Sequence, residues 1–405
     1  MVFAGTADQT RNSPAARHHP GQRAWRIAGY TVAAGFAAGV GAFAGQQVQA
    51  SWGRWAAGGY VLAALITLLW RHPAARTTAT SAALLGAVVA PLVWMVTGGR
   101  HMSTVGMGAL TVVTRAARLL VEHGSPYLPK DQLTGPESLN PYGPPLTIFG
   151  LPHALGLDGW AGNPRTWFAL SAVVLGYLTL RYLRAERPMW TLASAFASPI
   201  LALPLVLGGT DLPVLGLVAL GVALLARGSH AGLAGVALGI ACAMKATALP
   251  AALVLVPMLV ARDGWRRALA FAGSGVLAAL GSSAVTAPAM LADPSDLVHN
   301  MVLFPLRLTP QQTTAASPMP GQVIATDRSG GRVVMIALLV VLMVAVCVYL
   351  WRRPARTVST AVLQMAVIWA LVFSLAPSTR YGYFIYPLLM LGLRNLLPVR
   401  VRPRR

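Results

Sequence analysis

Apolar runs long enough to cross a lipid bilayer recur along nearly the whole chain. A bilayer core requires roughly 17–20 consecutive apolar residues in a helix. The 405-residue chain is 56% apolar and only 11% charged, which is too little charge to cover a soluble protein of this length. The sequence therefore predicts an all-α polytopic membrane protein with about twelve transmembrane helices. The last run is short, so a count of eleven stays open.

The expected spans lie within a membrane domain of residues 27–397, between basic tails at residues 1–26 and 398–405. In chain order they cover residues 27–45, 55–70, 79–97, 166–182, 189–208, 212–226, 231–246, 248–261, 268–285, 332–350, 358–376 and 381–394.

The charged residues are sorted between the two sets of connections that alternate along these spans. One set, which includes both chain ends, holds 21 of the 32 Lys and Arg residues but only Asp8, Glu186 and Asp263 among the 11 acids. Because Lys and Arg are retained in the cytoplasm during insertion, both termini are expected there, in a protein of the plasma membrane. The net charge of +21 comes from short basic clusters that follow spans, so we do not expect nucleic acid as a partner.

Two connections on the other side, residues 98–165 and 286–331, are long and rich in proline and aromatic residues. Loops of this length usually carry function. Within the first, residues 107–122 have a helical period, with Leu110, Val113 and Ala117 on one face and Arg115 and Arg118 on the other. This segment is expected to form an interfacial helix on the membrane surface.

Three charged residues approach the membrane at the face where the long connections lie. Asp211 lies between the fifth and sixth spans, Lys245 near the end of the seventh, and Arg380 before the last. Charges beside a bilayer are costly and often functional, so we expect a pocket in which the cations bind an anionic group and Asp211 acts as a base. The alternative is that each is an ordinary charge at a helix end.

Other site types find no support in the sequence. The two cysteines, Cys242 and Cys347, fall inside predicted spans without metal-ligand spacing, and the loop histidines are not paired at such spacing. The chain has no P-loop and no dinucleotide fingerprint. We therefore expect no metal and no cofactor.

Several segments, and the order in which they follow one another, resemble the family 87 glycosyltransferases. These are polyprenol-phosphate-mannose-dependent α-mannosyltransferases with a type-C glycosyltransferase fold. The segments are 112–129, 140–144, 208–213, the Met-Lys-Ala-Thr stretch that ends at Thr247, 304–306, 316–321 and 380–387. Together they extend over most of the chain between residues 105 and 390.

The resemblance implies a donor in which a sugar, mannose in the family, is attached to a polyprenyl phosphate. It also implies a lipid or glycan acceptor outside the cytoplasm. An outward-facing carboxylate, Asp211, would deprotonate the acceptor hydroxyl. Cations would stabilise the departing lipid phosphate, and membrane lipids would surround the protein. The expected substrate-binding residues are Lys245, Arg380, Tyr381, Tyr127, Asn140 and Tyr142.

The chain departs from the family pattern at one position. The family places an acid shortly before the Val-Val segment of the first long connection, where this sequence has Ala109. Either Asp211 or another acid of the long connections takes that role, or the chain is a catalytically inactive relative that acts as an assembly protein. A secondary transporter or flippase stays open as a further alternative, because twelve spans with both ends inside also suit many transporters. The sequence does not determine the oligomeric state.

Overall fold

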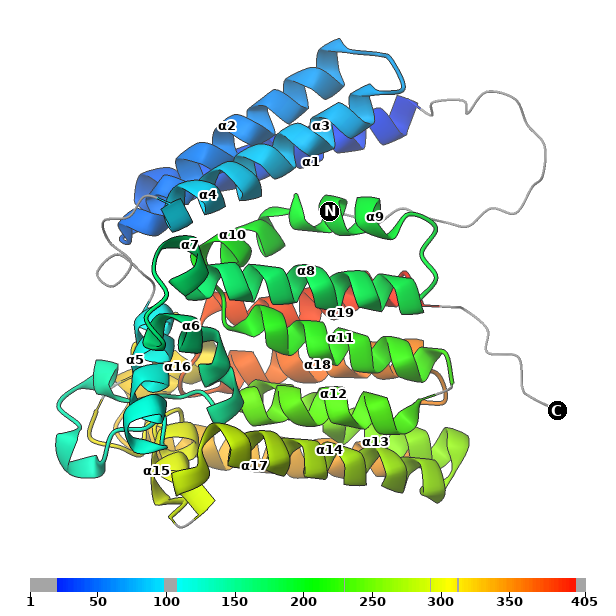
Figure 1. The fold of residues 1–405 in the computed structure, drawn as a ribbon. Coiled ribbons are helices and arrows are strands. Elements are labelled where there is room, and N and C mark those ends of the chain that lie inside the picture. The colour runs from blue at the N-terminus through cyan, green and yellow to red at the C-terminus, as the bar shows by residue number, and fades with distance from the viewer. Residues whose placement is uncertain (1–19, 98–107, 229, 292, 312, 398–405) are drawn as a thin grey trace. The chain divides into compact units, whose positions relative to one another are not determined.

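A computed structural model describes residues 20–97 and 108–397, apart from 229, 292 and 312 (Figure 1). These residues form helices and irregular connections, and within them the only β-type pairing is a single bridge between Ala316 and Thr379. The expected all-α class is confirmed. Residues 1–19 and 398–405 of the predicted tails, and residues 98–107 of the first long connection, lie outside the described residues. The chain divides into two compact units, residues 1–107 with 186–209 (unit 1) and residues 108–185 with 210–405 (unit 2).

Unit 1 consists of three long helical rods and a bent helix pair. Its elements are α1 (Pro20–Phe43), α2 (Gln47–Leu69), α3 (Ala75–Leu84), the π-helical turn η1 (Leu85–Val89), α4 (Ala90–Thr97), α9 (Pro188–Phe196) and α10 (Pro199–Leu207). The segments α3, η1 and α4 follow one another without a break and form a single rod. The helices α9 and α10 are bent by 80° relative to each other at a short break.

The π-helical turn in the third rod is explained by the proline that follows it. Pro91 has no backbone N–H, so the carbonyl of Ala87, four residues earlier, loses its usual helical donor. The Nε1 of Trp52, on α2, donates to this carbonyl at 2.8 Å. The Trp52 side chain is fully buried. A side chain from the neighbouring rod thus satisfies a backbone acceptor that would otherwise be unpaired inside the unit.

Unit 2 is a bundle of roughly parallel helices with short helical segments gathered at one end (Figure 1). Its α-helices are α5 (Gly108–His123), α6 (Leu151–Ala154), α7 (Gly159–Gly162), α8 (Pro164–Tyr182), α11 (Asp211–Ala226), α12 (Ala231–Met244), α13 (Leu249–Asp263), α14 (Trp265–Thr286), α15 (Ser295–Val298), α16 (Pro320–Asp327), α17 (Gly331–Arg352), α18 (Val358–Leu375) and α19 (Ile385–Arg394). The shorter turns are η2 (Lys130–Gln132), η3 (Pro136–Ser138), η4 (Pro144–Gly150), η5 (Ala246–Ala248), η6 (Pro288–Leu291), η7 (His299–Leu303) and η8 (Tyr381–Phe384).

One end of unit 2 holds both long connections and is called the loop end below. It is the end where α11 begins and α12 ends, and α5, α6, α7, α15 and α16 lie there (Figure 1). Within the bundle α11 packs against both α8 and α12, and α12 packs against α14. These neighbours are largely apolar all round, as expected for helices buried by other helices.

Each of the twelve apolar runs corresponds to helix, but fewer helices than twelve are long and apolar enough to cross a membrane. Six in the described part of the chain meet that test, or seven if α9 and α10 form one broken span. The apolar helices α11 and α12 have 16 and 14 residues. At 1.5 Å per residue they rise only ~21–24 Å, which is less than the ~30 Å thickness of a bilayer core.

The helix α5 is amphipathic. Leu110, Val113 and Ala117 are buried, together with Val112 and Ala116, whereas Val121 is exposed. On its polar side Arg115 donates to the backbone carbonyls of Glu137, Ser138 and Leu139. The apolar face of α5 therefore packs onto η4 and α6, and its arginine anchors the segment that leads to Asn140.

We expect Trp52→Phe to lower the stability of unit 1, because it leaves the Ala87 carbonyl buried without a donor. The cost of an unsatisfied buried acceptor is about 1–3 kcal/mol. The measurement is the midpoint of unfolding of the purified full-length protein in mild detergent. Trp25→Phe is the matched control, because Trp25 is 81% exposed. Equal midpoints for wild type and Trp52→Phe would contradict the role assigned to this indole.

Candidate active site

A buried ion pair lies at the loop end of unit 2. Asp211 is the first residue of α11, and Lys245 follows the last residue of α12. The Nζ of Lys245 is 2.5 Å from Oδ1 of Asp211 and 3.3 Å from the hydroxyl of Thr210. The side chains are only 8% and 18% exposed. The antiparallel packing of α11 on α12 brings together these two charges, which are 34 residues apart in the sequence.

The carboxylate of Asp211 is also hydrogen-bonded by a residue near the C-terminal end of the chain. The hydroxyl of Tyr386, on α19, donates to Oδ1 of Asp211 at 2.7 Å. It also lies 2.8 Å from the hydroxyl of Thr247, whose backbone carbonyl accepts from the indole of Trp369 at 2.7 Å. Tyr386 and Trp369 are fully buried. A hydrogen-bonded chain thus connects α11, η5, α18 and α19 at one point.

Two tyrosine rings cover the ammonium group of Lys245. Its Nζ lies 5.4 Å from the ring centre of Tyr142 and 5.3 Å from that of Tyr383. Both distances are within the range of a cation–π interaction, which strengthens when water is excluded. The cation is therefore enclosed by one carboxylate, one hydroxyl and two aromatic faces.

The environment keeps Lys245 positively charged. The Asp211 carboxylate and the hydrogen bond to it favour the charged form of the ammonium and offset the cost of its burial. Burial raises the pKa of Tyr142, which keeps its hydroxyl neutral.

The first long connection is held against the ion pair by its own polar residues. Tyr127 donates to the backbone carbonyl of Tyr142 at 2.8 Å, and the side-chain oxygen of Asn140 accepts from the backbone N–H of Tyr142 at 3.1 Å. The N–H of Gly143 donates to the carbonyl of Met244, the last residue of α12, at 2.9 Å. A Cβ at position 143 would lie 1.6 Å from the carbonyl oxygen of Ala243, so only glycine fits there.

The two long connections also contact each other. The N–H of Asn140 donates to the side chain of Asn300, in η7, at 2.7 Å. Arg380 donates to the hydroxyl of Thr314 at 2.8 Å, and Ser317 accepts from the N–H of Tyr381. Both long connections therefore contribute to the loop end.

The expected site residues occupy three different environments. Asp211, Lys245 and Tyr142 converge directly. Tyr127 and Asn140 contact the Tyr142 segment rather than the ion pair. Arg380 and Tyr381 contact the second long connection, and the Tyr381 side chain is 58% exposed.

Four residues of the ion-pair environment were not expected from the sequence: Thr210, Thr247, Tyr383 and Tyr386. They belong to three segments, Gly208–Pro213, Met244–Thr247 and Arg380–Pro387, that the sequence singles out as wholes. Which tyrosine of 381, 383 and 386 turns inward depends on the η8 turn, which carries no strong sequence signal. Their hydroxyl and aromatic character is the only signal that could have found them.

No acidic residue lies near position 109 along the helix, because the only acid of α5 is Glu122. Ala109 lies half-buried in the first turn of α5. The remaining acids of this connection, Glu122, Asp131, Glu137 and Asp158, are exposed. Among all described residues, no three His, Cys, Asp or Glu side chains are grouped closely enough to hold a metal ion.

A family model described as glycosyltransferase family 87 matches residues 140–378, which is more than half of the chain. The chain belongs to glycosyltransferase family 87. No curated protein and no solved structure matches it significantly. The matched range begins at Asn140, contains Asp211 and Lys245, and ends two residues before Arg380. Family membership and the long apolar helices together identify the protein as a membrane glycosyltransferase.

We expect Lys245→Met to destabilise unit 2 by about 3–5 kcal/mol, because it leaves the Asp211 carboxylate buried without a counter-charge. Removing both charges in Lys245→Met with Asp211→Leu should recover much of this loss, since the desolvation cost then disappears with the charge. The measurement is a double-mutant cycle on the midpoint of unfolding in detergent. Arg380→Gln is the control, because this cation is outside the pair. Additive effects of the two single substitutions would show that the charges do not stabilise each other.

Proposed function

We propose that the protein transfers a sugar, mannose by the resemblance described above, from a polyprenyl-phosphate donor to a hydroxyl of a lipid or glycan acceptor. The reaction would take place at the loop end of unit 2. Family membership and the convergence of Asp211, Lys245 and Tyr142 support this proposal. In it the ion pair is the centre of the site, and the long connections surround the substrates.

The proposed orientation places the loop end outside the cytoplasm and both termini inside, in the plasma membrane. The distribution of Lys and Arg along the sequence supports it. Up to twelve crossings are compatible with this orientation, provided that α11 and α12 complete theirs with the irregular segments at their ends. In this orientation the basic tails 1–26 and 398–405 would lie in the cytoplasm, and α5 would lie on the outer membrane surface.

Asp211 is the proposed general base. Both of its described hydrogen bonds go to Oδ1, and the side chain stays 18% exposed, which leaves Oδ2 to accept a proton. In the reaction Oδ2 takes the proton of the acceptor hydroxyl as its oxygen forms a bond to the anomeric carbon of the sugar. The bond from that carbon to the phosphate oxygen breaks, and its electron pair leaves with the polyprenyl phosphate.

Two cations have different proposed roles. Lys245 holds Asp211 in place, because its ammonium is already surrounded by the carboxylate, Thr210 and two tyrosine rings. Arg380 has no carboxylate within 4 Å among the described residues, and its guanidinium is bonded only to a neutral hydroxyl. It is therefore the better candidate to bind the donor phosphate, with Tyr381 beside it as an exposed aromatic surface for the substrate.

A non-catalytic assembly role is the second candidate, and the alanine at position 109 favours it. In this reading the Asp211–Lys245 pair serves only to join α11, α12 and α19. The two functions differ in one respect, which is whether the purified protein turns over a lipid-linked sugar.

We expect Asp211→Asn to lower the rate of sugar transfer by about 10²–10⁴-fold, the usual contribution of a general base. The assay follows radiolabelled sugar from polyprenyl phosphate into the extractable lipid and glycan product. Asp293→Asn is the matched control, because this acid belongs to the second long connection and is solvent-exposed. The unfolding midpoint of each variant shows whether it is folded. Undiminished turnover by a folded Asp211→Asn protein would exclude the residue as the base, and the absence of turnover by wild type would favour the assembly role.

We expect a membrane-impermeant maleimide to label a cysteine at Asp131, in the first long connection, on intact cells. A cysteine at Arg356, in the connection between α17 and α18, should be labelled only after permeabilisation. Both positions are exposed in the structure, and Cys242 and Cys347 are first replaced by serine or alanine. Labelling of the two positions in the reverse pattern would overturn the proposed orientation.

A further inference from the structure

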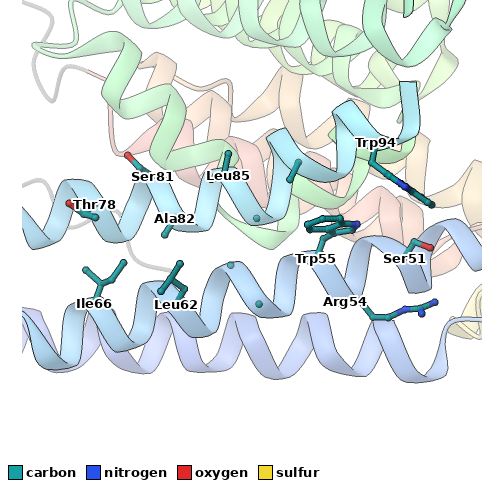
Figure 2. Close-up of a pocket in the computed structure, with 14 residues that line it drawn as sticks. Ser51, Arg54, Trp55, Leu62, Ile66, Thr78, Ser81, Ala82, Leu85 and Trp94 are labelled. Carbon is teal, nitrogen blue, oxygen red and sulfur yellow. The ribbon is translucent and has the colours of Figure 1, made fainter. Parts of the chain in front are cut away.

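Unit 1 contains a groove between α2 and the rod formed by α3, η1 and α4 (Figure 2). Its volume is about 840 Å³, and both of its sides are membrane-length helices. The two backbones touch where Gly59 meets Gly86, since a Cβ on Gly86 would lie 2.5 Å from the Cα of Gly59. This contact bounds the groove on its inner side, and larger side chains on either helix form its walls.

The walls of the groove are mainly apolar and open to the surroundings. Trp55, Leu62, Leu85 and Trp94 line it, and each is about half exposed. Because α2 and the facing rod are both candidate membrane spans, the groove lies at the depth of the lipid chains. Hydrocarbon is the material that fills such a surface without leaving polar groups unsatisfied.

The two ends of the groove differ in charge. Ser51, Arg54 and Trp94 lie at one end, and Ile66, Thr78 and Ser81 lie at the other (Figure 2). The one described hydrogen bond of the Arg54 side chain goes to the carbonyl of Ala50 at 3.4 Å, and no described carboxylate is within 4 Å of it. At the other end the hydroxyl of Thr78 is already bonded to the carbonyl of Ala74. A ligand with an anionic head and an apolar chain matches this polarity.

The length of the groove identifies the kind of lipid. Ser51 and Ile66 are 15 residues apart on α2, which corresponds to ~22 Å along the helix axis. One bilayer leaflet with its head groups is about 20–22 Å thick. We propose that the groove binds an anionic phospholipid of the leaflet in which α2 begins, with one acyl chain along Trp55 and Leu62 and the phosphate at Arg54. A polyprenyl chain would extend well beyond a groove of this length.

The test measures lipid binding to the full-length protein in detergent by native mass spectrometry, with phosphatidylglycerol and phosphatidylcholine as probes. Phosphatidylglycerol should bind more tightly than the zwitterionic lipid. Arg54→Gln should weaken its binding about fivefold, the effect of one basic side chain near an anionic head group. Arg71→Gln is the matched control, because Arg71 is also exposed, two residues after the end of α2, but does not line the groove.

A second variant tests the apolar part of the site. A Cβ at Gly58 would meet no atom within 4 Å, so Gly58→Leu fits the fold, raises helix propensity and occupies the groove. It should abolish retention of phosphatidylglycerol while the unfolding midpoint is maintained.

Wild-type affinity for phosphatidylglycerol in either Arg54→Gln or Gly58→Leu would overturn the proposal. So would displacement of the bound phospholipid by polyprenyl phosphate at lower concentration, which would identify a different occupant. No sugar donor is present in these measurements, so their failure would leave the proposed transferase function unaffected.

Discussion

The ion pair between Lys245 and Asp211 is the interaction on which the loop end of unit 2 depends. An isolated buried charge would cost several kcal/mol, and the two charges are tolerated because each neutralises the other while hydroxyls and tyrosine rings complete their surroundings. The pair links the start of α11 to the end of α12, and the hydrogen bond from Tyr386 adds α19 at the same point. Such a pair contributes little to net stability compared with apolar packing. Its retention is better explained by the fixed position that it gives to one carboxylate oxygen.

The same requirement, that no polar group be left alone in an apolar interior, shapes unit 1. There the unpaired group is a backbone carbonyl freed by Pro91, and the donor is the indole of Trp52. The π-helical turn and the hydrogen bond from the buried indole both follow from Pro91. In both units a side chain from a neighbouring helix thus supplies the partner of a polar group that the helices bury.

Sequence patterns predicted the helical class and the position of every long helix, because apolar runs of this length have few alternatives in a bilayer. They did not predict how far each helix continues. The run at 189–208 carries no charge, yet it bends by 80° at the break between Phe196 and Pro199. The approach of Asp211 to Lys245 could be anticipated, since both were expected at the same face. The sequence could not show that Tyr386 rather than Tyr381 would contact Asp211, because this depends on the turn at η8. It also could not show the hydrogen bond between Asn140 and Asn300, which are 160 residues apart.

The absence of a side chain at position 143 has a consequence for mutational scans of this family member. The backbone there lies against the Ala243 carbonyl with no room for even one methyl group. An alanine at this position would push the whole Asn140–Pro145 segment away from α12 and carry the Tyr142 ring off the ammonium. A lost activity would then report a displaced main chain rather than a missing functional group. Activity lost on substitution in this stretch should therefore be interpreted as a steric effect on the backbone.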